Sequence, residues 1–200
     1  MLVELKEQVL VILQYSWPMI VMAVVVAITI RVGYLKKHNE KAVLYKEIFN
    51  LLFILYIVCL FHAVTYQDVS WSSANIIPFK EILRYEFGSG LFYKNIFGNL
   101  LLFLPYGLYV TYYLDLKKPI SVVMYAFVVS LSIELIQSII GRVFDVDDIL
   151  LNVFGSLLGY FIYKIFDKFE DMLPDWLKKE WLIDVLVVLL VGGVVWFLIR

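Results

Sequence analysis

Charged residues are scarce in this chain of 200 residues, and their scarcity excludes an ordinary soluble domain. Lys and Arg together number 17 and Asp and Glu 18, while 62% of the residues are apolar, against roughly 45–50% in globular proteins. The net charge of −1 lacks the basic excess of a nucleic-acid binder. Cys59 is the only cysteine, which excludes an internal disulfide. A mean hydropathy of +0.86 then indicates a polytopic membrane protein.

Recognised chemical motifs are absent as well. The sequence contains no G-x-S-x-G nucleophile motif, no H-E-x-x-H zinc motif and no phosphate-binding P-loop. It also lacks internal repeats and linkers rich in Pro, Gly and Ser. Any function must therefore be read from how individual polar residues are placed among the apolar ones.

Long apolar stretches dominate the sequence. A membrane-crossing helix needs about 20 predominantly apolar residues. Six stretches come close to that length: 9–30, 48–66, 95–114, 119–140, 149–166 and 181–199. The last two carry Lys164 and Asp184, each near an end where its charge can reach the interface. We expect an all-α membrane bundle of five to six transmembrane helices.

The distribution of basic residues predicts the orientation. Ten of the 17 Lys and Arg residues follow the first, third and fifth stretches, and Lys164 lies at the end of the fifth, which makes eleven on one side. Short basic loops favour the cytoplasmic side. Both termini, together with loops 67–94 and 141–148, are therefore predicted to lie outside.

Two connecting segments have the character of interfacial helices. Between residues 166 and 181, apolar side chains recur at helical spacing among charges, with a break expected at Pro174. In the outer loop, Pro78 suits a first helical position, and Gly88 and Gly90 mark the end of the segment. Both segments are predicted to lie flat on the membrane.

Polar side chains gather on single faces of three predicted helices, at i, i+4 or i, i+3 spacing. Such groups are costly inside a bilayer, so each is a functional hypothesis by default. The faces carry Asn95 and Asn99; Ser130, Glu134 and Gln137; and Asn152, Gly155 and Gly159.

These faces share one depth. At a rise of about 1.5 Å per residue, Asn99, Glu134 and Asn152 fall within roughly 10 Å of the outer surface. The outer loops add further polar residues just above them. The sequence thus predicts one outer-leaflet binding pocket. Its candidate residues are Asn75, Asn99, Glu134, Gln137, Arg142, Asp145, Asp147, Asp148 and Asn152.

Structural explanations compete with functional ones at several of these positions. Gly155 and Gly159 form a G-x-x-x-G pattern, which favours close helix packing. Glu134 is a candidate catalytic residue, but it could equally form an ion pair with Arg142. That pair requires the chain to turn back after Gly141, which can adopt a positive φ.

Asp145, Asp147 and Asp148 offer enough carboxylate oxygens to bind Mg²⁺ or Ca²⁺, so a divalent cation is a candidate cofactor. Their spacing differs from that of an EF-hand loop. Alternatively, Asp147 or Asp148 caps the helix that follows, where exposed N–H groups favour a carboxylate.

Four segments occur in an order that resembles the successive motifs of VanZ-like membrane proteins. They are Asn75-Ile-Ile-Pro-Phe79, the run from Asn95 to Gly107, Glu134-Leu-Ile-Gln137, and the run from Arg142 to Gly155. The resemblance implies a core of four transmembrane helices over residues 48–166. Residues 1–47 are then an extra helix with a basic cytoplasmic loop, and residues 167–200 an amphipathic segment with a final helix.

The resemblance also implies a setting. The family takes its name from a protein associated with reduced susceptibility to teicoplanin-type glycopeptide antibiotics. This chain is therefore expected to be a multi-pass protein of the bacterial plasma membrane and to meet membrane lipids.

Three classes of function stay open at this stage. The first is a module that binds an envelope lipid, a lipid-linked cell-wall precursor or a lipid-tailed glycopeptide. The second is a metal-dependent enzyme acting on a lipid-linked phosphate or sugar, with Glu134 as general base. The third is a structural bundle whose polar groups bind one another.

Overall fold

The fold is described by a computed structural model, which covers residues 2–65, 74–86, 88–172, 174, 176–177 and 179–199. The predicted all-α class is confirmed. Within these residues there is no β-strand, and a single parallel β-bridge joins Asn75 to Asp145. The chain divides into two compact units, one of residues Met1–Ala63 with Met172–Arg200 and the other of Val64–Asp171.

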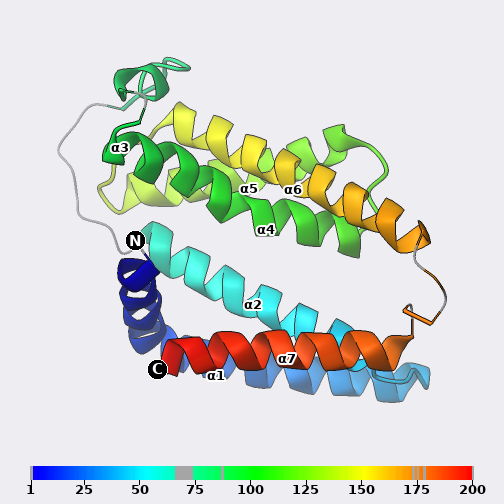
Figure 1. The fold of residues 1–200 in the computed structure, drawn as a ribbon. Helices are drawn as coiled ribbons and strands as arrows, with labels where there is room; N and C mark the ends of the chain where they lie inside the picture. The colour runs from blue at the N-terminus through cyan, green and yellow to red at the C-terminus, as the bar shows by residue number, and fades with distance from the viewer. Residues whose placement is uncertain are drawn as a thin grey trace. The chain divides into compact units, whose positions relative to one another are not determined.

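The first unit contains three long helices, α1 (Leu2–His38), α2 (Leu44–Thr65) and α7 (Glu180–Ile199). Helix α1 bends in its N-terminal half (Figure 1), the half that contains Pro18, whose ring removes a backbone donor.

Polar contacts join the helices of this unit. The guanidinium of Arg31 donates to the carboxylate of Glu47 at 2.9–3.0 Å across the turn between α1 and α2. The N–H of Tyr45 donates to Asp184 Oδ1 at 2.7 Å, so α7 caps the beginning of α2. Asp184, which the sequence placed near a helix end, thus satisfies a backbone donor of another helix.

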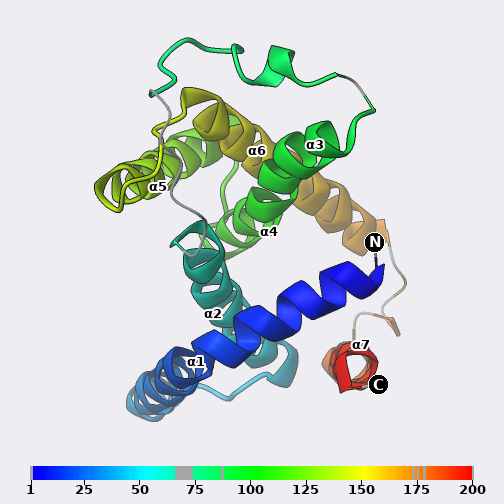
Figure 2. The same ribbon diagram turned by 90° about the vertical axis from the view of Figure 1, so that its left-hand side faces the viewer.

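The second unit is built on three helices. Its first helix begins as α3 (Gly90–Phe92), continues through a π-helical turn (Tyr93–Phe97) and becomes α4 (Gly98–Tyr113) without a break. Helices α5 (Pro119–Ile139) and α6 (Val146–Met172) follow. Helices α4 and α6 run in one direction and α5 in the other (Figure 1). Figure 2 shows the segment before α3 crossing from the α5–α6 turn to the start of α3.

Three glycines bring the backbones of α4 and α6 into direct contact. A Cβ atom on Gly107 would overlap the backbone oxygen of Ser156. Gly155 and Gly159 have the same relation to backbone oxygens of α4, those of Leu100 and Leu104. The G-x-x-x-G pattern is therefore a packing face, as the sequence indicated.

Four helices of the described chain are long and apolar enough to cross a membrane. They comprise Leu10–His38, Leu44–His62, Pro119–Ile139 and Val146–Phe169. The other two predicted spans fall on α4 and α7, which are helical, and their crossing of the membrane stays a prediction.

The interfacial segments differ from expectation. Phe166, Phe169 and Met172 continue α6 instead of starting a separate amphipathic helix, because a helix does not need to end where its apolar run ends. Helix α6 stops two residues before Pro174, as a proline requires. In the loop before α3, Pro78 lies in a turn ahead of a short 3-10 helix, Ile82–Arg84.

We predict that Gly107→Ala destabilises the protein, because overpacking typically costs about 1–3 kcal/mol and the clash here is with backbone. The matched control is Gly98→Ala in the same helix, where a Cβ meets nothing within 4 Å. Replacing glycine in a helix should stabilise slightly there. Thermal unfolding in detergent compares the two, and equal melting temperatures would contradict the close approach of α4 and α6.

Candidate functional site

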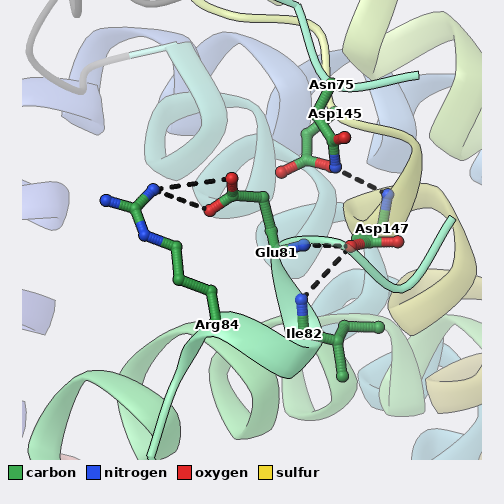
Figure 3. A network of polar contacts seen from close by, with 6 residues as sticks. All are labelled: Asn75, Glu81, Ile82, Arg84, Asp145 and Asp147. Atoms are coloured by element: carbon green, nitrogen blue, oxygen red, sulfur yellow. Dashed lines mark hydrogen bonds and ion pairs between the residues drawn. The ribbon is translucent and has the colours of Figure 1, made fainter. Parts of the chain in front are cut away.

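The loop before α3 is fastened to the turn before α6. The backbone N–H of Asn75 donates to the carbonyl of Phe144 at 2.8 Å, and the N–H of Val146 donates to the carbonyl of Asn75 at 3.0 Å. The side-chain amide of Asn75 donates to Asp145 Oδ1 at 2.8 Å (Figure 3). Asn75 is buried, so this candidate site residue clamps the loop in place.

Asp147 organises the next turn of the same loop. Its carboxylate accepts the backbone N–H of Phe79 at 2.5 Å. It also accepts the N–H groups of Glu81 at 2.7 Å and Ile82 at 3.2 Å, which Figure 3 shows. The side chain is 1% exposed. Both oxygens of Asp147 therefore cap a loop that is distant in sequence, a role that the sequence did not predict. Metal binding by Asp147 stays a prediction. Phe79 has a φ of 67°, a conformation that L-residues rarely adopt.

The turn between α5 and α6 has the geometry anticipated at Gly141. Its φ is 87°, and the N–H of Arg142 donates to the carbonyl of Gln137 at 2.9 Å, which closes a Schellman-type helix end. The turn brings the N–H of Asp145 to 2.9 Å from Glu134 Oε2. The turn at Gly141 therefore brings Asp145, which directly precedes α6, next to Glu134 of α5.

Four charged side chains meet at this end of the second unit. Glu134 is 1% exposed, while Asp145 and Asp148 are partly exposed. Arg142 lies close enough to attract the carboxylates of both Glu134 and Asp148. The amide of Asn99 donates to Asp148 Oδ1 at 2.5 Å, which joins α4 to α6.

A second polar layer lies one helical turn away from these acids, at Ser130 before Glu134 on α5 and at Asn152 after Asp148 on α6. Asn152 Nδ2 donates to Ser130 Oγ at 2.9 Å, and both side chains are buried. Asn152 Oδ1 is buried without a hydrogen-bond partner. Ser156 Oγ donates to the carbonyl of Asn152 at 3.1 Å and lies 3.3 Å from that of Phe103.

Some features of the site were not predicted. The π-helical turn containing Asn95 leads directly into Gly98 and Asn99, so these two asparagines are not related by a regular α-helical turn. Ser130 was noted on the Glu134 face but left out of the site, although its i, i+4 spacing was the available signal. The backbone donors of Glu81 and Ile82 carry no sequence signal at all.

The three candidate metal ligands take different partners. Asp147 accepts loop N–H groups, Asp148 accepts from Asn99, and Asp145 accepts from Asn75 and from the N–H of Asp147 at 2.9 Å. Across the part of the chain that the structure describes, no three His, Cys, Asp or Glu side chains form a group that could hold a metal ion.

A family model described as VanZ/LLP1 matches residues 48–167, more than half of the chain. The chain belongs to the VanZ/LLP1 family. The resemblance found in the motifs is thereby confirmed, and the matched range includes every candidate site residue. No curated protein and no solved structure matches the chain.

Asp145 lies in the turn just before α6, outside the membrane-spanning segments, and its pKa is shifted. Burial raises the pKa of its carboxyl above the ordinary value. Hydrogen bonds from the Asp147 N–H and the Asn75 amide oppose this rise, and the neighbouring carboxylates of Asp147 and Glu81 add to it.

We predict that Asp147→Asn loosens the loop, because an amide offers one acceptor oxygen where the carboxylate offers two. Hydrogen bonds to a charged group contribute about 1.5–3 kcal/mol, so a loss of that order is expected. Trypsin should cut faster at Lys80 and Arg84. Asp115→Asn is the control, since Asp115 is exposed and Asn tolerates its φ of 46°. Unchanged cleavage would mean that Asp147 does not hold the loop.

A second prediction concerns pH. Because its pKa is raised, Asp145 binds a proton more tightly in the folded protein than in the unfolded chain, where aspartate has a pKa of about 3.9. This stabilisation is complete below the unfolded pKa and is lost as pH rises through the folded pKa. The melting temperature of the wild type should therefore fall relative to Asp145→Asn as the pH rises above about 4. A difference that moves the opposite way would contradict the raised pKa.

Proposed function

We propose that this VanZ/LLP1 protein binds the head group of an envelope lipid, or of a lipid-tailed glycopeptide, at the polar cluster of Asn99, Glu134, Arg142, Asp145 and Asp148. The cluster would face the outer leaflet of the bacterial plasma membrane. By holding a lipid-tailed glycopeptide there, the protein would lower susceptibility to teicoplanin-type antibiotics.

The observation that carries the proposal is Glu134, a carboxylate buried within the membrane-spanning helix α5. Ionisable groups in such positions are costly and usually mark a functional site. Packing alone does not require the partly exposed acids Asp145 and Asp148 beside it.

The neighbouring loop supports a lipid-facing site. Ile76 and Leu83 are 74% and 80% exposed, on a loop that Asp147 and Asp145 hold in place. Exposed apolar side chains next to a membrane-spanning bundle are suited to the interface between head groups and acyl chains. Asn75 and Asp147 hold this loop in place, whereas Glu134 and Asp148 are the acids of α5 and α6 that we expect to face a ligand's head group.

Native mass spectrometry of the protein extracted from its membrane tests the binding. Bound lipid should be retained by the wild type and reduced in Glu134→Gln, which keeps an acceptor for the Asp145 N–H but removes the charge. Asp115→Asn, an exposed acid in the α4–α5 connection, provides the control for lost charge. Equal lipid retention by all three proteins would overturn the proposal.

The orientation has its own test, in a Cys59→Ser background. Leu83→Cys should react with a membrane-impermeant maleimide on intact cells, because the loop is predicted to be outside and Leu83 is exposed. His38→Cys, at the exposed end of α1, should react only after permeabilisation. The reverse pattern would move the polar cluster to the cytoplasmic leaflet.

A further inference from the structure

We infer that the polar cluster recognises a primary ammonium group, such as the amine of an ethanolamine head group, and not a phosphate. This inference rests on the proposed function and names the chemistry of its ligand.

Acidic side chains outnumber basic ones around the cluster. Helix α5 supplies Glu134, and the α5–α6 turn and α6 supply Asp145 and Asp148, against the single positive charge of Arg142. From the loop, Arg84 pairs at 3.1 Å with Glu81 and so adds no net charge. With any two of these three acids ionised, the described residues that face the cluster carry a net negative charge, which attracts a cation and repels an anion.

A second observation is independent of charge. Asn152 lies one turn beyond Asp148 on α6, and its partner Ser130 lies one turn before Glu134 on α5. This spacing places Asn152 on the same helix face as Asp148. Its Oδ1 atom is buried and accepts no hydrogen bond. A buried polar atom in this state costs free energy until a donor reaches it. An ammonium group has three N–H donors, whereas a phosphate brings further acceptors.

An aromatic side chain completes the set. Burial raises the pKa of the Tyr85 phenol, and the charges of Glu81, Asp148 and Asp145 add to the rise, so the phenol lies near these acids. Tyrosine faces attract ammonium groups, and a ring beside carboxylates is suited to a cation. Tyr85 belongs to the loop that Asp147 anchors, so the loop contributes directly to the recognition of the ligand.

The experiment uses the full chain in nanodiscs of phosphatidylglycerol, into which a second lipid is titrated. Phosphatidylethanolamine carries a primary ammonium, while phosphatidylcholine has the same phosphate but no N–H donor. Native mass spectrometry should show phosphatidylethanolamine bound about tenfold or more over phosphatidylcholine, since hydrogen bonds to a charged group contribute roughly 1.5–3 kcal/mol. Free ethanolamine in the buffer separates the sources: competition by it indicates a soluble amine, and no competition indicates a lipid head group.

Two variants give opposite expectations. Asp148→Asn should weaken the preference for phosphatidylethanolamine about tenfold or more. Arg142→Gln should strengthen it, because it removes a positive charge that repels an ammonium group. Should Asp148→Asn fail to fold, Tyr85→Leu replaces it, with Asp115→Asn as the control.

If Arg142→Gln instead abolishes binding, or if phosphatidylglycerol is preferred, the cluster recognises phosphate. That result would contradict the ammonium inference and leave the lipid-binding proposal supported. Retention of no lipid of any kind would remove both.

Discussion

The arrangement of this site depends on one carboxylate. Asp147 accepts three backbone N–H groups from a loop 65–68 residues away in sequence, and its own N–H is held by Asp145. Asp145 in turn is bound by Asn75 and donates its N–H to Glu134. The loop, the turn and α5 are therefore linked through consecutive hydrogen bonds. Charge-assisted bonds of this kind are about twice as strong as neutral ones, and burial protects them from water.

The glycine contact between α4 and α6 is the second requirement. Asn99 is a short side chain, and it reaches Asp148 on α6 only because the two backbones approach closely. Gly107, Gly155 and Gly159 allow that approach along the helices. Packing in the apolar part of the unit and polar geometry at its end are thus set by the same contact.

Much of this organisation could be predicted from sequence, and the remainder has identifiable physical reasons. Uncharged runs predicted the helices, since a bilayer selects for such runs. The rise per residue predicted that Glu134 and Asn152 lie at one depth. Helix ends were less predictable: α1 and α6 continue past charged residues that interrupt the apolar pattern. The role of Asp147 could not be read at all, because a side chain that binds backbone N–H groups places no constraint on the residue types that donate them. The positive φ of Phe79 has no sequence signal either, because phenylalanine rarely adopts this conformation.

The two units differ in how they are composed along the chain. The second unit, which contains the polar cluster, is one continuous segment, whereas the first consists of two segments that precede and follow it in the sequence. A ribosome therefore completes the second unit before α7 exists. Until α7 arrives, the N–H of Tyr45 at the start of α2 lacks the carboxylate of Asp184. Biosynthesis thus imposes an order: the second unit is complete first, and the cap on α2 forms only after every residue of that unit has been made.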